Sequence, residues 1–134
     1  MKFIKNNKPK LTIIMLMLML IVSCDPPRYY NYHVTNSCNE EIMVKIEIKK
    51  GRFGYETEPK ITKINSNTTE LIHSDEHWQP LDSKYVEYFL EKITITKGND
   101  TSKVNYVDKD LWEFKKTSKN HANSYLTVYP EDFE

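Results

Sequence analysis

The sequence predicts an all-β domain, a single small antiparallel β-sandwich of the immunoglobulin or transthyretin type, behind an N-terminal signal peptide. Two observations predict the sandwich. Apolar and polar residues alternate with a period of two, most clearly from Ile42 to Lys49, which is typical of strands with one buried face. About seven such segments are short and separated by turn residues, as in a sandwich or barrel.

The first strand is expected from Tyr29 to Thr35, with Tyr30, Tyr32 and Val34 on one face. Residues 36–40 have turn chemistry. In the next strand the apolar face carries the isoleucines and the valine, and the opposite face is a solvated charged surface that discourages edge pairing. The charged residues of that surface are Lys45, Glu47, Lys49 and Lys50.

The middle of the chain predicts short strands. We expect them at residues 55–58, 61–64 and 69–73, with a polar turn at residues 65–67 and a loop from Ser74 to Pro80. Residues 84–91 are ambiguous. Tyr85 with Phe89 fits a helical stripe that Asp82 or Ser83 could cap, so one helical turn or an irregular strand is expected there.

The last third continues the strand pattern. Ile93 to Thr96 predicts a strand, and residues 97–100 form a turn. Residues 102–107 and 111–114 predict two further strands, the second alternatively a short turn bearing Trp112. A loop at residues 120–123 precedes a final strand, residues 125–129, with Leu126 and Val128 inward.

The first 23 residues have the layout of a secretory signal. Four lysines and no acid occupy the first ten positions, and residues 11–22 are almost wholly apolar. This stretch is shorter than the roughly 20 residues of a spanning helix. Residues 1–23 are therefore expected to direct export and to be removed.

The boundary Ile21-Val22-Ser23-Cys24 resembles the lipobox of bacterial lipoproteins. The resemblance implies that signal peptidase II cuts before Cys24 and that this cysteine carries a diacylglyceryl group on its sulfur, often with a further acyl chain, such as palmitate, on the new amino group. Two or more acyl chains suffice for stable attachment to a bilayer. The domain organisation expected is a signal peptide (1–23), a lipidated tether (24–28) and a β-sandwich domain (29–134). An uncleaved anchor, or an ordinary signal peptide with an accidental cysteine, stays open.

The expected location is the bacterial cell envelope. A single Asp25 follows the cysteine, with no cluster of acids, which favours a periplasm-facing protein and leaves exposure on the outer surface open. The mature part also resembles small Bacteroidetes lipoproteins of uncharacterised function. The resemblance is loose. It lies in the CDPP start with its tyrosines, the ITI strand before the KGND turn, and the SYLTVYPEDF end, and it implies no activity.

Composition narrows the function classes. The chain has 19 basic and 19 acidic residues, and the four lysines of the signal leave with it, so the mature domain has 15 basic residues and a net charge near −4. This charge disfavours nucleic acid as a partner. No phosphate-binding glycine loop, GxSxG, HExxH or CxxC motif is present, and no cofactor is expected. Cys38 is expected to be a buried, inert thiol, with an intermolecular disulfide as the alternative.

Two weak binding sites remain. His73 and His77, with Asp75 and Glu76 between them, carry good ligands for zinc, and His33 or His121 is a possible third ligand. HxxxH, however, brings two ligands together only on a helix, so we expect a polar loop rather than a metal site.

The other site is aromatic. It consists of Tyr29, Tyr30, Tyr32, Trp78 and Trp112, of which Trp78, Tyr30 and Tyr32 are the main candidates. Such rings stack on sugars or anchor protein partners. Filling of the core is the alternative that we favour.

The function that these features favour is a lipid-anchored, non-enzymatic binding or structural module with a protein or glycan partner. A small envelope inhibitor or immunity-type protein, blocking a hydrolase with the loop from Ser74 to Pro80, is the second hypothesis. A metal-dependent hydrolase using His73 and His77 is the third.

Overall fold

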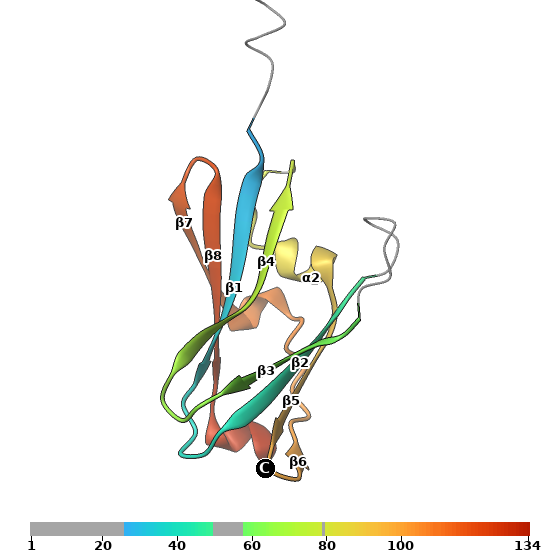
Figure 1. Ribbon diagram of the computed structural model, residues 1–134, viewed down its shortest axis with the longest axis vertical. Helices are drawn as coiled ribbons and strands as arrows, with labels where there is room; N and C mark the ends of the chain where they lie inside the picture. Colours follow the sequence, from blue (N-terminus) through green and yellow to red (C-terminus); the bar gives the residue numbers. More distant parts are fainter. Residues whose placement is uncertain (1–25, 50–57, 79) are drawn as a thin grey trace, which may run out of the picture.

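The computed structural model describes residues 26–49, 58–78 and 80–134. Within these ranges the chain forms two four-stranded sheets, which confirms the predicted β-sandwich. Sheet A has the strand order β4-β1-β8-β7 and sheet B the order β3-β2-β5-β6 (Figure 1). The signal peptide, Cys24 and residues 55–57 of the short strand expected at residues 55–58 lie outside the described residues.

Sheet A contains the first and the last strand of the chain order. Its members are β1 (Arg28–Asn36), β4 (Thr69–His77), β7 (Trp112–Ser118) and β8 (His121–Val128). β1 and β8 are the two central strands and run parallel, whereas the remaining neighbours pair antiparallel. A parallel pair needs a long connection, and here the rest of the domain provides it. The sandwich is therefore antiparallel as predicted, except at this one pair.

Sheet B contains the charged strand that the sequence predicts most clearly. Its members are β2 (Ile42–Ile48), β3 (Lys60–Ile64), β5 (Leu90–Lys97) and the two-residue β6 (Asp100–Thr101). All three of its strand pairs are antiparallel. The turn between β5 and β6 places Gly98 at φ +58, a conformation that favours glycine, which confirms the predicted turn.

One apolar core lies between the sheets. β1 contributes Tyr30, Tyr32 and Val34, and β2 contributes Ile42, Val44 and Ile46. These are alternate residues of their strands, which confirms the predicted period of two. Cys38 is completely buried in this core and is free, and burial raises the pKa of its thiol. An inaccessible thiol fits the packing role that we expected rather than an intermolecular disulfide.

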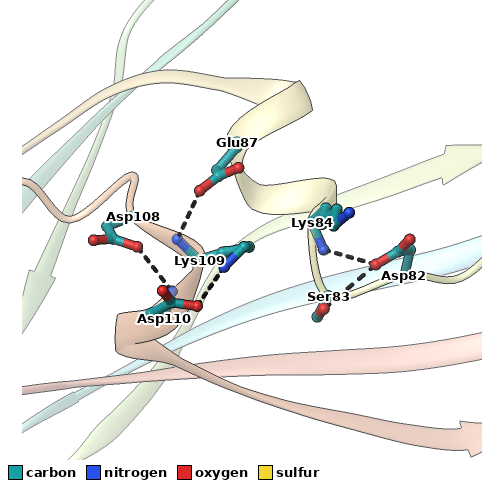
Figure 2. A network of polar contacts seen from close by, with 7 residues as sticks. All are labelled: Asp82, Ser83, Lys84, Glu87, Asp108, Lys109 and Asp110. Atoms are coloured by element: carbon teal, nitrogen blue, oxygen red, sulfur yellow. Dashed lines mark hydrogen bonds and ion pairs between the residues drawn. The ribbon is translucent and has the colours of Figure 1, made fainter.

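A short helix, α2 (Tyr85–Phe89), precedes β5 and confirms the predicted helical turn. The side chain of Asp82 accepts a hydrogen bond from the backbone N–H of Lys84 at 3.0 Å, as Figure 2 shows. Glu87 faces the 3₁₀ turn η1 (Lys109–Leu111), where its carboxylate accepts a hydrogen bond from the backbone N–H of Lys109 at 3.4 Å (Figure 2). The contact of Glu87 with Lys109 holds α2 against the segment that leads into β7.

Three local predictions are wrong. The segment Ser74–His77 is strand rather than loop, because β1 begins at Arg28 and pairs with β4 as far as His77. β8 begins at His121 rather than after Asn123, since it pairs with both β1 and β7 there. Residues 102–107 form no strand but a looped segment with a buried Tyr106, whose carbonyl accepts a hydrogen bond from Trp112 Nε1 at 2.8 Å. In the first two cases a pairing partner outside the segment decides the outcome.

A β-bulge reorients the second half of β4. His33 pairs with Leu71 and Tyr32 pairs with His73, so Ile72 is an extra residue without a partner in β1. Ile72 is consequently buried while Leu71 stays exposed. From the bulge onward His73 and Asp75 lie opposite the core tyrosines Tyr32 and Tyr30.

A 3₁₀ turn, η2 (Pro130–Phe133), follows β8. In Figure 1 the start of β1 and the C-terminus lie at opposite ends of the domain. Among the described residues, no helix is both long and apolar enough to cross a membrane.

Candidate functional site

The outer face of sheet A is the best candidate site, and it is built by strand register. The outward residues of β1 pair with the outward residues of β8 in parallel alignment. We call these eight residues the neutral face: Tyr29, Asn31, His33, Thr35, His121, Asn123, Tyr125 and Thr127. None of them is Lys, Arg, Asp or Glu, and burial lowers the pKa of His33 below its ordinary value, which keeps its ring uncharged at neutral pH.

Hydrogen bonds between neighbouring strands fix the polar side chains of this surface. Asn31 Nδ2 donates to Asn123 Oδ1 at 3.1 Å, and Ser74 Oγ donates to Asn31 Oδ1 at 2.8 Å. The hydroxyl groups of Thr35 and Thr69 are 2.8 Å apart. β4, β1 and β8 thus carry a continuous polar network across the sheet.

Two ring pairs complete the neutral face. His33 stacks on Tyr125 with centroids 4.9 Å apart and planes 18° apart, and Tyr29 stacks on His121 at 5.0 Å and 22°. Each pair joins β1 to β8 at a register position. Because one side of each ring is covered by its partner, the surface cannot offer these rings as fully open flat platforms.

A cleft of about 210 Å³ lies at the end of the neutral face away from Tyr29. Tyr125 and Thr127 of the neutral face line it together with Leu111, Glu113, Tyr129 and Asp132. Glu113 lies opposite Tyr125 in the neighbouring strand β7. Asp132 Oδ2 accepts a hydrogen bond from the backbone N–H of Tyr129 at 2.9 Å, which holds η2 at the rim.

The two candidate zinc ligands do not face solvent on a loop. His77 is buried and stacks on Tyr85 of α2 at 3.9 Å, and His73 stacks on Phe89 at 5.0 Å. Four residues of extended strand separate their Cα atoms by about 13 Å. The two rings also stack on different residues of α2, so they do not converge on one ion position.

The proposed third ligands lie elsewhere. His33 and His121 belong to the outer surface of sheet A, whereas His73 pairs with the core residue Tyr32. In the described ranges, no group of three or more His, Cys, Asp or Glu side chains could hold a metal ion.

Beneath α2 the inner surface of sheet A carries buried polar groups. Burial lowers the pKa of His73 to about 4 and raises the pKa of Asp75 to about 6. His73 Nε2, Asp75 Oδ2 and the Tyr32 hydroxyl are buried, and no hydrogen bond reaches them from the part of the chain that the structure describes. Such groups weaken the fold.

The aromatic candidates divide into core and surface. Tyr30 and Tyr32 are completely buried, and Trp112 is nearly so. The hypothesis that Tyr30 and Tyr32 bind a partner directly is therefore wrong, because the inward register of β1 places them between the sheets. Trp78 is 66% exposed and follows β4 at the Arg28 end of the domain, where Arg28 Nη1 donates to its carbonyl at 2.8 Å.

The neutral face was not recognised from the sequence. Its β1 half was visible as the outward side of a predicted strand, but its β8 half begins in residues that the sequence predicts as a loop. The alternation of His121, Asn123 and Tyr125 with Ala122 and Ser124 was the available signal. Comparisons of the chain with protein family models, with curated proteins and with solved structures found no significant match.

Proposed function

We propose that this chain is a non-enzymatic binding module of the bacterial cell envelope, anchored by lipid on Cys24, that docks another protein on the neutral face. The anchor rests on the lipobox-like sequence at residues 21–24. The docking surface rests on the composition and geometry of sheet A. β1 begins at Arg28, the last residue of the proposed tether. The neutral face therefore starts next to the proposed anchor and extends away from it along β1.

A contrast between the two outer surfaces carries the proposal. The outer surface of sheet B presents Lys45 and Glu47, which form an ion pair of 3.0 Å, and Lys92 opposite Glu47. The central strands of sheet A present no Lys, Arg, Asp or Glu at the positions of the neutral face. Depletion of charge with enrichment of aromatic residues distinguishes the centre of a protein interface from ordinary surface.

The ring geometry favours a protein over a glycan. Sugars bind aromatic side chains through an open ring face, and the stacking of His33 on Tyr125 covers one of the two faces of each ring. Lys115, from the other neighbouring strand, also lies over Tyr125, with Nζ 5.3 Å from the ring centroid. Protein-binding paratopes are typically rich in Tyr, Ser and Asn. The hydrogen bonds among Asn31, Asn123 and Ser74 fix these side chains before binding, which lowers the entropy cost of association.

The structure gives less support to the two other hypotheses. An inhibitory loop was expected from Ser74 to Pro80, but its first four residues belong to β4. A hydrolase would need His73 and His77 to converge, but each ring stacks on a different residue of α2.

Photocrosslinking in the native cells tests the docking surface. A benzoylphenylalanine replaces Thr35 on the neutral face or, as the matched control, Thr94 on the outer surface of sheet B; both are half-buried threonines of central strands. We expect an adduct of one defined mass from position 35 alone, and we expect Asn123→Arg to abolish it without changing the melting temperature by more than a few degrees. Equal adducts from both positions, or an adduct that persists with Asn123→Arg, would contradict the proposal.

A further inference from the structure

The cleft beside the neutral face has an unbalanced lining. Glu113 and Asp132 supply two carboxylates, and tyrosines supply rings, but no Lys, Arg or His lines it. Tyr129 and Leu111 are among the exposed large apolar side chains of the domain. The lining therefore combines negative charge with aromatic surface, which is the chemistry that attracts organic cations.

The protein's own Lys115 contacts two residues of the lining. Lys115 does not line the cleft, but its Nζ is 3.0 Å from Glu113 Oε1 and 5.3 Å from the ring centroid of Tyr125, both of which do. The Lys115 and Glu113 side chains are both more than half exposed. An exposed ion pair of this kind contributes little stability, so an incoming cation can replace Lys115 at small cost.

The size of the cleft limits the ligand. At about 210 Å³ it is smaller than the roughly 300–1,000 Å³ of typical small-molecule and cofactor sites. One long side chain suits this volume better than a cofactor does. A guanidinium group fits the lining better than an ammonium, because it is planar, stacks on aromatic rings and bonds a carboxylate through two N–H groups.

We propose that the cleft receives an arginine side chain of the partner protein, which displaces Lys115 from Glu113 and Tyr125. The inference rests on the proposed docking of a protein on the neutral face. It adds one charged contact, in the cleft at the end of that face. Arginine is a frequent hot-spot residue of interfaces. The partner would therefore present an arginine at the edge of an otherwise uncharged docking surface.

Ligand-observed NMR with the full chain in detergent micelles tests the contact. The probe is N-acetyl-arginine amide, and the matched neutral probe is N-acetyl-citrulline amide, which has the same shape without the charge. We expect the arginine probe to give saturation transfer and the citrulline probe to give little. Glu113→Gln should weaken the arginine probe by about 2- to 5-fold, the range expected for one exposed charge pair.

Lys115→Met gives the sharper result, because it removes the internal competitor. We expect it to tighten binding of the arginine probe by about 2- to 5-fold, whereas Lys116→Met, the neighbouring exposed lysine, should have less effect. If only the overall positive charge mattered, both variants would strengthen binding equally. That result would overturn the proposal. Equal binding of arginine and citrulline probes, or no response to Glu113→Gln and Lys115→Met, would overturn it as well.

The two proposals fail separately. If the Thr35 adduct forms and is abolished by Asn123→Arg but the arginine probe does not bind, the docking surface stands and the arginine contact is wrong. If the probe binds as expected and no adduct forms at Thr35, the cleft recognises a cation but the neutral face does not dock a protein, and the partner's arginine is ruled out as its source.

Discussion

Tyr30 and Tyr32 stack on each other on the inner side of β1, with ring centroids 5.4 Å apart, but their hydroxyl groups have different surroundings. The Tyr30 hydroxyl donates a hydrogen bond to the carbonyl of Asp82, in the segment before α2. The Tyr32 hydroxyl is buried, and no described residue bonds it. Two neighbouring residues of the same type thus give a matched pair for measuring what a buried hydroxyl contributes.

Tyr32→Phe should stabilise the protein. Phenylalanine keeps the ring and its stacking on Phe89 at 6.1 Å but removes a hydroxyl whose desolvation is uncompensated, so we expect the free energy of unfolding to rise by about 1 kcal/mol. Tyr30→Phe deletes a formed hydrogen bond and should lower the free energy of unfolding by about 1 kcal/mol. Urea denaturation of both variants measures the effects. A loss of stability in both would mean that the Tyr32 hydroxyl has a partner.

His73 and Asp75 should have opposite effects on stability as a function of pH. Burial lowers the pKa of His73 from 6.5 to about 4, so the unfolded chain takes up this proton first and stability falls as pH drops from about 6.5 to 4. Burial raises the pKa of Asp75 from 3.8 to about 6. The stability that depends on this shift is therefore fully present below about pH 3.8 and is lost as pH rises through 6.

Replacing either group should reveal the other. In Asp75→Asn the free energy of unfolding should fall more steeply than in the wild type as pH is lowered from 6.5 to 4. Only His73 then contributes to the pH dependence, and it lowers stability in acid. In His73→Phe, which keeps a ring against Phe89, it should rise relative to the wild type over the same range. Denaturation at several pH values between 3.5 and 7 measures both slopes. Parallel curves for the three proteins would show that neither group is buried as described.

Ile46 and Lys45 test the alternation of β2. Ile46 is 2% exposed and packs in the core, so Ile46→Asp should cost at least about 4 kcal/mol, because it leaves a charge buried without a partner. Lys45 lies on the outer surface and its ion pair with Glu47 is partly exposed. Lys45→Asp should therefore cost no more than about 1 kcal/mol. Melting temperatures and far-ultraviolet circular dichroism distinguish the two; equal tolerance would contradict the register of β2.

Cys24→Ala tests the anchor. If the thiol carries the lipid, the variant should leave the membrane fraction or accumulate as an unprocessed precursor, and labelling with a palmitate analogue should disappear. Cys38→Ala is the control: this thiol is completely buried, so its replacement should change neither fractionation nor labelling. Membrane attachment and labelling that survive Cys24→Ala would rule out the lipoprotein hypothesis.

The sequence by itself determined the all-β class and the inward side of the clearest strands. Residues from Ile42 to Ile48 alternate strictly, and one buried side of a sheet is enough to impose that alternation. The short helix at Tyr85 and the turn at Gly98 were also visible, because a helical stripe and a glycine turn are local signals. The lipobox-like segment is likewise a local signal, and the lipid anchor that it implies stays a prediction.

Tertiary structure alone decided where β4 ends, where β8 begins and what lies on the outer side of sheet A. The sequence HSDEH of residues 73–77 has weak strand propensity, and it becomes a strand because β1 is available as its partner. The bulge at Ile72 then turns His73 toward the core, which periodicity in β4 could not indicate. The neutral face needs the parallel pairing of the first and last strands, which brings His33 against Tyr125 across 92 positions of sequence. No local pattern encodes such a pairing, because its free energy comes from contacts that form only when the whole sandwich closes.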